Sequence, residues 1–241
     1  ATLPKPRAIL IASAHWETAT PMLGGGERPE TIHDFGGFPE ALYTLRYPAA
    51  GSPEIAQRAA ALLKAAGHPA SVNGCRGLDH GAWVPLRRMH PHADVPVVQL
   101  SIQPALGPEH HLRIGEALAP LADEGVLVIG SGSITHNLRD WMTVMQRAQG
   151  RGLDAALAPL PYVLEFTDWL EARVAAGDRA AVLEYREHGA AGVRAHPTDE
   201  HFLPLFVAWG AAGAEARGRR VHHSVDAAAL AMDAYRFDAA A

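Results

Sequence analysis

The sequence is poor in cysteine, in aromatic residues, in excess positive charge and in long apolar runs. Cys75 is the single cysteine among 241 residues, which excludes a disulfide framework or a thiolate metal cluster, so a bound metal needs nitrogen or oxygen ligands. With 21 Lys and Arg against 26 Asp and Glu, the chain has no basic excess to match a phosphate backbone, and nucleic acid is not an expected partner. No apolar run approaches the roughly 18 residues of a membrane span.

The N-terminus lacks the charged and apolar regions of a signal peptide. We therefore expect a cytoplasmic protein without a membrane partner, in which Cys75 is a reduced thiol. Hydrophobic residues make up 48% and charged residues 20% of the chain, and this composition is that of a soluble globular protein.

Short β-branched runs alternate with alanine-rich helical stretches along the chain. This order predicts an α/β fold in which a central mixed or parallel sheet is flanked by helices. No repeat or flexible linker divides the sequence, so we expect one catalytic domain over residues 1–241. The expected strands are 7–13, 94–101 and 125–130, the expected helices are 53–66, 108–121, 161–174 and 204–214, and residues 139–160 are expected to form a surface excursion.

Several of the 14 histidines fall just beyond predicted strands. His15 and His136 follow the first and third strands, His80 lies in the predicted loop G-L-D-H-G-A-W, and His196 and His201 precede an apolar helix. Ligands of open α/β sheets bind at the carboxyl ends of the strands, and neutral imidazole is the commonest metal ligand. This placement indicates a site for a divalent first-row metal, although no short ligand motif such as H-E-x-x-H is present.

Other histidines and motifs do not by themselves indicate a functional site. The sequence Gly130-Ser131-Gly132 lacks the third glycine of a dinucleotide fingerprint, and no G-x-S-x-G elbow supports a serine nucleophile. The aromatic and glycine-rich segment 31–39 is equally compatible with a pocket wall and with a packed loop. We interpret six histidines as surface pairs: His90 and His92, His110 and His111, and His222 and His223.

Seven blocks in order carry a resemblance to one family: S-A-H-W-E, T-I-H-D-F-G-G-F-P, Y-P-A-A-G-S-P-E, G-L-D-H-G-A-W-V-P-L, D-V-P-V-V-Q-L-S, G-S-G-S-I-T-H-N-L and H-P-T-D-E-H-F-L-P-L. From Leu3 to about Phe237 the chain resembles the DOPA 4,5-dioxygenase branch of the class III extradiol ring-cleaving dioxygenases. This resemblance implies a mononuclear non-haem Fe(II), with zinc as an occupant in isolated protein. It also implies that a catechol and O₂ are the substrates and that a muconic semialdehyde is the product.

The resemblance also implies roles for individual residues. His15 and His201 correspond to metal ligands, His136 to a histidine described either as a ligand or as the acid/base beside the metal, and His80 to a pocket histidine near the substrate oxygens. His136 is therefore the first choice for acid/base catalysis and His80 the second. Because this branch has histidine where related enzymes use glutamate, Glu200 ranks below His201 as a ligand. The residues expected to bind substrate are His33, Asp34 and Phe35.

One family block, G-H-G-S-P, whose histidine is a ligand, has no counterpart before S-A-H-W-E. We expect the natural protein to be longer at its N-terminus by some tens of residues that supply this ligand. Two alternative functions stay open at this point, a zinc-dependent hydrolase and a non-catalytic metal-binding protein, both built on the same histidines. The oligomeric state is also open.

Overall fold

The computed structural model describes residues 4–148 and 157–238. The chain divides into two compact units, the first made of Ala1–Gly132 and Leu203–Ala212, the second of Ser133–Phe202 and Gly213–Ala241. That residues 1–241 form one catalytic domain stays a prediction.

The first unit is built on a five-stranded sheet with the order β3-β2-β4-β1-β5. Its long central strand β1 (Ala8–Glu17) pairs in parallel with both β4 (Val97–Ile102) and β5 (Val126–Ser131). The short strand β2 (Met22–Gly24) is antiparallel to β4 and parallel to β3 (Ser71–Asn73). The predicted α/β class with a mixed sheet flanked by helices is confirmed.

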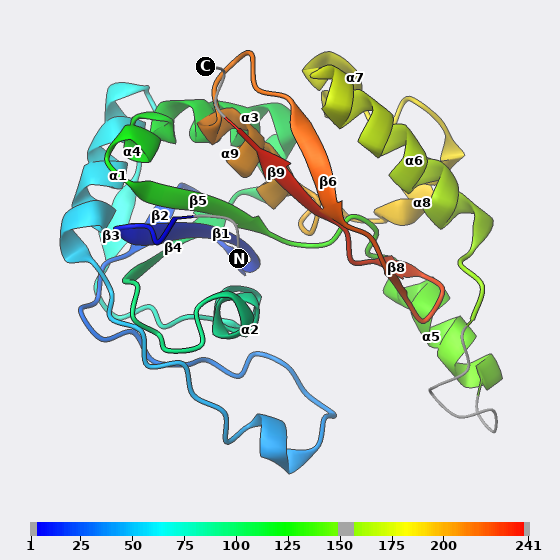
Figure 1. Cartoon of the computed structure of the whole chain (residues 1–241), viewed down its shortest axis with the longest axis horizontal. Helices are drawn as coiled ribbons and strands as arrows, with labels where there is room; N and C mark the ends of the chain where they lie inside the picture. The colour runs from blue at the N-terminus through cyan, green and yellow to red at the C-terminus, as the bar shows by residue number, and fades with distance from the viewer. Residues whose placement is uncertain (1–3, 149–156, 239–241) are drawn as a thin grey trace. The chain divides into compact units, whose positions relative to one another are not determined.

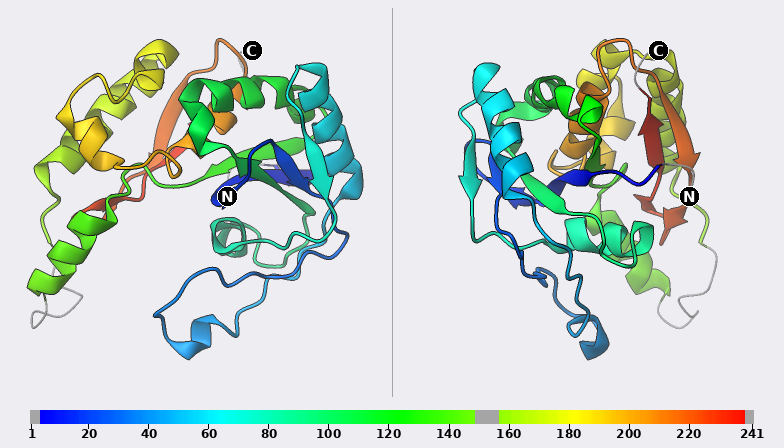
Figure 2. Two further views of the ribbon diagram at one scale, coloured as in Figure 1. Left: turned by 180° about the vertical axis from the view of Figure 1, so that it is seen from behind. Right: turned by 60° about the vertical axis from the view of Figure 1, so that its left-hand side comes forward.

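Helices cover both faces of this sheet because alternate side chains of a strand point to opposite faces. Leu10 of β1 lies in an apolar core with residues of α1, α3 and α9, whereas Ile11 lies in a second core with Trp83 of α2. Figures 1 and 2 show α2 on the opposite side of the sheet from α1 and α3. The helices of this unit are α1 (Pro53–Ala65), α2 (His80–Met89), α3 (Gly107–Leu118), α4 (Pro120–Asp123) and α9 (Leu203–Ala211), with short 3₁₀ turns at Glu40–Leu42 and Pro104–Leu106.

Helices α3 and α9 approach each other closely through two glycines. A Cβ atom on Gly115 would lie 2.3 Å from the Val207 carbonyl oxygen, and one on Gly210 would lie 2.2 Å from the Leu112 carbonyl oxygen. No side chain fits at such distances, so both positions require glycine. Gly130 of β5 is equally crowded, because a Cβ there would lie 2.0 Å from the Pro204 carbonyl oxygen. This close approach fixes α9 against the end of β5.

The second unit combines helices with two small antiparallel ribbons. Its core gathers the aromatic rings of Phe166, Tyr185 and Phe202 around the buried ring of His196. In Figure 1 α6 and α8 lie side by side, as do β6 and β9. The elements of this unit are α5 (Leu138–Ala148), α6 (Pro161–Ala176), α7 (Arg179–Leu183), α8 (Ala190–Ala195), β6 (Gly218–His222), β7 (Val225–Asp226), β8 (Leu230–Ala231) and β9 (Ala234–Phe237).

Some expectations from the sequence need correction. Helix α5 occupies residues 138–148, where the sequence predicts a surface excursion; residues 149–156 of that segment lie outside the described residues. His111 is not a surface residue, because it is only 1% exposed, with Nε2 accepting from the backbone N–H of Gln103 at 3.0 Å. His15 lies inside β1 rather than beyond it, and His80 begins α2 rather than lying in a loop.

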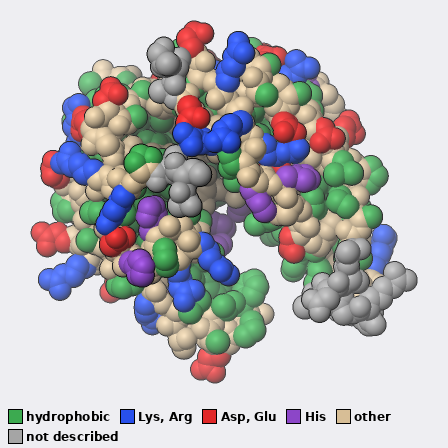
Figure 3. Space-filling model, viewed as in Figure 1, with side chains coloured by type: hydrophobic (Ala, Val, Ile, Leu, Met, Phe, Trp, Pro, Cys, Tyr) green, Lys and Arg blue, Asp and Glu red, His purple; other side chains and the backbone are tan. Residues whose placement is uncertain are grey.

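Two properties of the described residues concern membranes and charged partners. Among the described residues, no helix combines the length and apolar character needed to cross a membrane. On the face shown in Figure 3, Lys and Arg side chains are interspersed with Asp and Glu.

Candidate metal and catalytic residues

The first group of candidate residues is His15, Asp34 and His80 in the first unit, whose potential ligand atoms all lie within 4.8 Å of one another. Oδ2 of Asp34 is 3.0 Å from Nδ1 of His80 and 3.9 Å from Nδ1 of His15. The His15 and His80 rings are 3.9 Å apart between centroids. Two imidazoles and a carboxylate at these distances form a donor set suited to a divalent first-row metal or to proton transfer.

Asp34 contacts His80 through both of its carboxylate oxygens. Oδ1 accepts a hydrogen bond from the backbone N–H of His80 at 2.8 Å. Oδ2 is at ion-pair distance from Nδ1 of the His80 ring, but the angles between these two groups are not those of a hydrogen bond. Burial raises the pKa of Asp34, but the hydrogen bonds and charge of His80 outweigh it and hold the pKa below its usual value. Asp34 is therefore ionised near neutral pH and disposed to orient the His80 ring.

A buried polar network behind His80 fixes the start of α2. Asp79 is fully buried and caps the helix: its carboxylate accepts from Ser13 Oγ at 2.7 Å and from the Ala82 N–H at 3.2 Å. The guanidinium of Arg76 and the side-chain amide of Gln99 also donate to it. Such a fully satisfied carboxylate costs little to bury and rigidifies the residues that it joins.

Pro85 in α2 leaves one helix carbonyl free to accept a hydrogen bond from the sheet. Because proline has no N–H, the carbonyl of Gly81, four residues earlier, is left without its helical donor. Ser131 Oγ at the end of β5 donates to this carbonyl at 2.5 Å. Gly81 also lies close to β1, since a Cβ there would be 2.4 Å from Ser13 Oγ and 3.0 Å from Cδ2 of His15. The first turn of α2, which carries His80, is thereby held against β1 and β5.

The second group is His136, Glu200 and His201 in the second unit, whose potential ligand atoms likewise lie within 4.8 Å of one another. The two imidazoles stack with centroids 3.4 Å apart and an angle of 11° between their planes. Glu200 Oε1 is 3.1 Å from His201 Nδ1 and 3.9 Å from His136 Nδ1. The hydrogen bond with His201 lowers the pKa of Glu200 to about 2 despite the opposing effect of burial.

Backbone contacts place these two histidines. The N–H of His136 donates to the Ala195 carbonyl at 2.8 Å, and the N–H of Ser133 donates to the His201 carbonyl at 2.9 Å. The segment after β5 is thus tied to the residues on both sides of Glu200. Two stacked imidazoles beside a carboxylate offer the nitrogen ligands that iron and zinc accept.

His196 does not belong to either group. Its ring is fully buried among Phe166, Tyr185 and Phe202, and Nε2 is 2.8 Å from the Ile134 carbonyl oxygen. Burial lowers the pKa of His196 to about 3, so this ring is neutral near neutral pH. Of the histidines that the sequence places beside predicted strands or before the apolar helix, His196 is thus a buried core residue.

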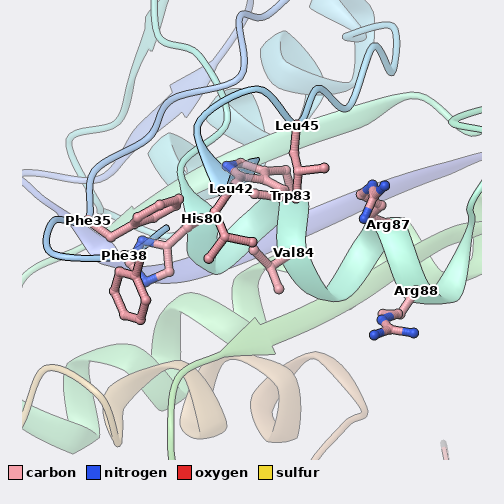
Figure 4. A pocket seen from close by; sticks show the side chains of 9 residues that line it. All are labelled: Phe35, Phe38, Leu42, Leu45, His80, Trp83, Val84, Arg87 and Arg88. Atoms are coloured by element: carbon pink, nitrogen blue, oxygen red, sulfur yellow. The ribbon is translucent and has the colours of Figure 1, made fainter. Parts of the chain in front are cut away.

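A pocket of about 410 Å³ adjoins His80 in the first unit. Phe35 is part of its wall, with its ring 5.6 Å from that of His80 and 6.2 Å from that of Trp83, whereas His33 lies behind the wall with Nε2 3.0 Å from the Leu45 carbonyl oxygen. The aromatic segment 31–39 therefore contributes to a pocket wall. Figure 4 shows the lining side chains on α2 and on the loop region 35–45, and the apolar ones are Phe35, Phe38, Leu42, Leu45, Trp83 and Val84.

Reasoning from the sequence missed several residues around these groups. It did not identify Asp79 as the cap of α2, although the motif D-H-G-A places an N-cap residue three positions before Ala82. It ranked Glu200 as a possible ligand but did not foresee its hydrogen bond with His201. Arg87 and Arg88, which line the pocket beside Val84, carry no sequence signal except their helical spacing from His80.

Comparison with known proteins identifies the family to which the chain belongs. Residues 1–237 match the family model described as the catalytic LigB subunit of aromatic ring-opening dioxygenase. The chain belongs to this family of metal-dependent enzymes, and it is an extradiol ring-cleaving dioxygenase, an oxidoreductase.

Its similarity to individual proteins covers most of the chain. It is 43% identical over 234 residues to a 4,5-DOPA dioxygenase extradiol of Beta vulgaris, an alignment that covers 97% of this chain and 83% of that protein. Its identity to the 4,5-DOPA dioxygenase extradiol of Escherichia coli K12 is 40% over 214 residues, covering 87% and 74%. The crystal structure of an uncharacterized Escherichia coli K12 protein superposes with a TM-score of 0.76 at 30% identity and covers 97% of this chain and 87% of that chain.

Proposed function

We propose that this protein is an Fe(II)-dependent extradiol dioxygenase that inserts both atoms of O₂ into a catechol, DOPA or a simpler analogue, and releases a muconic semialdehyde. The observation that carries this proposal is the clustering of histidines with carboxylates, His15 and His80 with Asp34, and His136 and His201 with Glu200. Relatives named for DOPA cleavage at 38–43% identity support the substrate class.

The donor chemistry fits iron. Neutral imidazoles and carboxylates are the ligands of non-haem Fe(II) sites, and they bind zinc equally well in isolated protein. When bound, Fe(II) supplies the one-electron chemistry that allows triplet O₂ to react with a singlet catechol, which zinc does not. We assign metal-ligand roles to His15, His136 and His201.

His80 is proposed to move a proton of the substrate. The Nδ1 of His80 faces the ionised Asp34 carboxylate, and the ring lines the pocket. In the proposed reaction, the other ring nitrogen accepts a catechol hydroxyl proton and returns a proton during ring opening. His136 is the alternative acid/base group if it does not ligate the metal. The Phe35 ring packs edge-on against the His80 ring beside this position.

Variants of the histidines separate ligand from acid/base roles. His15→Ala and His201→Ala are expected to lose bound metal and activity together. His80→Ala should keep its metal and slow ring cleavage by about 10²- to 10⁴-fold, the usual contribution of a general acid/base. Metal analysis of the purified variants together with oxygen uptake checks this assignment. Full metal occupancy in His201→Ala would overturn the ligand assignment.

A further inference from the structure

One face of α2 joins the candidate acid/base group to a pair of arginines. His80, Trp83, Val84, Arg87 and Arg88 follow the i, i+3, i+4, i+7, i+8 spacing of a single helical face, and all five line the pocket. Figure 4 shows His80 at one end of the row and both arginines at the other. Seven residues at 1.5 Å each separate His80 from Arg87 by roughly 10 Å along the helix.

The middle of this pocket is aromatic and apolar. The Phe35 ring packs edge-on against the Phe38 ring at 5.6 Å, and Trp83 closes the inner side. Phe38 is 55% exposed and Val84 is 43% exposed, so large apolar surfaces face the pocket without covering from the described part of the chain. A volume of about 410 Å³ is that of a small-molecule site. The walls suit a flat aromatic ring.

The arginine end of the pocket carries uncompensated positive charge. Arg87 and Arg88 are exposed, and no carboxylate of residues 4–148 or 157–238 lies within ion-pair distance of either guanidinium. Other arginines of the same unit are paired, as Arg58 is with Glu124 and Arg113 with Glu109. A guanidinium binds a carboxylate through two parallel hydrogen bonds, so this pair is available to an anionic ligand.

We propose that Arg87 and Arg88 form a subsite for an anionic side chain of the substrate. The catechol ring lies against the apolar wall that Phe35, Trp83 and Val84 line, with its hydroxyls toward His80, and a carboxylate on a short side chain reaches the arginines. The orientation of the ring rests on the proposed function. The substrate class that follows is an aromatic diol with an acidic side chain, distinguished from neutral catechols and from catecholamines.

Three catechols with side chains of similar length test the subsite in the Fe(II)-loaded enzyme: anionic dihydrocaffeate, neutral propylcatechol and cationic dopamine. Wild type should cleave dihydrocaffeate with the highest kcat/KM. In Arg87→Gln/Arg88→Gln, the KM for dihydrocaffeate should rise by about 10- to 100-fold, the effect of losing a charge-assisted hydrogen bond, with kcat retained. The KM for propylcatechol should not change.

Two further variants sharpen this result. Arg28→Gln removes an exposed arginine outside the pocket and should leave the preference for dihydrocaffeate intact, which controls for net charge. Arg87→Glu/Arg88→Glu should reverse the preference toward dopamine. Equal kcat/KM for dihydrocaffeate and propylcatechol in wild type, or an unchanged KM in Arg87→Gln/Arg88→Gln, would overturn the subsite.

A binding measurement separates this subsite from the proposed reaction. Dimethoxyphenylpropionate has no free hydroxyls and cannot be cleaved, and calorimetric titration compares it with its neutral amide. Tighter binding of the acid, lost in Arg87→Gln/Arg88→Gln, would support the subsite even if no catechol were cleaved, in which case only the proposed function fails. Equal binding of acid and amide by wild type would refute the subsite whatever the catalytic result.

Discussion

Asp34 and Glu200 each contact a candidate histidine, and we infer a different role for each carboxylate from these contacts. Asp34 touches His80 through backbone and side chain, so it governs the orientation of a proposed proton-transfer group. Glu200 accepts from His201, so it governs the orientation of a proposed metal ligand. A carboxylate that accepts from one ring nitrogen sets which nitrogen is left for the metal or the substrate.

Asp34→Asn tests the first of these tasks. The amide removes the negative charge that faces His80 Nδ1 while keeping the size of the side chain, so the ring loses the carboxylate that orients it. We expect kcat to fall by about 10²- to 10⁴-fold, within the range of a general acid/base contribution, while metal content is unchanged. Oxygen uptake and metal analysis on one preparation measure both. Loss of the metal in this variant would show instead that Asp34 is a ligand.

Glu200→Gln tests the second. Loss of the carboxylate beside His201 should weaken metal binding by about 10- to 100-fold, the usual effect of removing a group that orients a ligand. His201→Ala removes the proposed ligand itself and should therefore weaken metal binding more than Glu200→Gln does. Competition with a chelator gives both affinities. If the two variants lost metal to the same extent, Glu200 would have to be counted as a ligand itself.

The sequence could single out the candidate histidines but not the side chains that contact them. His15, His80, His136 and His201 stand in motifs that resemble the family, and two pairs among them are brought together. Asp34 is 46 residues from His80 in the chain, and only the folded arrangement shows that its carboxylate faces that imidazole. Residues that act through such distant contacts leave no local pattern.

At the scale of elements, the contact between α3 and α9 depends on two glycines that leave no space for a side chain. Gly210→Ala places a Cβ within 2.8 Å of the Glu116 backbone nitrogen as well as on the Leu112 carbonyl. Overpacking of this kind typically costs about 1–3 kcal/mol of the free energy of unfolding. Urea denaturation measures the loss. Gly74→Ala, where nothing lies within 4 Å of the added Cβ, is the matched control and should change the stability little.

The buried His111 of α3 makes stability depend on pH. Burial lowers the pKa of His111 to about 4 in the folded protein, from 6.5 for an unperturbed imidazole. Between these values the unfolded chain binds more protons, so the contribution of His111 is complete above pH 6.5 and is lost as the pH falls toward 4. The loss amounts to at most roughly 3 kcal/mol.

The free energy of unfolding measured between these pH values checks this assignment. His111→Gln should flatten the pH dependence, whereas substitution of the exposed His92 by Gln should not. The same slope in wild type and His111→Gln would contradict the assignment.

The sequence predicts the long strands of the sheet, but it misses the two shortest strands of that sheet and also helices α2 and α5. The predicted strands at 7–13, 94–101 and 125–130 correspond to β1, β4 and β5. Strands β1 and β4 are largely buried, and buried parallel strands have continuous apolar runs; β5 has such a run as well, although only its Val126 is buried. Strands β2 and β3 have three residues each and give no such signal. Helix α5 was not predicted although Leu138, Trp141 and Met142 follow helical spacing, and none of its residues is buried. Helix α2 was not predicted because it contains Pro85, which is normally a sign against a helix.

For the molecule as a whole, the proposed reaction is oxygen-dependent ring cleavage with Fe(II). The two alternatives that the sequence by itself left open use the same histidines but need no dioxygen: a zinc hydrolase would work equally well without air, and a non-catalytic metal-binding protein would turn over nothing. The reaction itself therefore distinguishes them better than any measurement of metal content.

The most direct measurement is oxygen uptake by the anaerobically Fe(II)-loaded protein after addition of dihydrocaffeate or DOPA, with absorbance recorded in the same cell. We predict that O₂ is consumed in equal amount to the catechol while the yellow ring-opened product accumulates, and that the zinc-loaded protein does neither. Fe(II)-loaded protein that binds its metal fully and consumes no O₂ with either catechol would contradict the account.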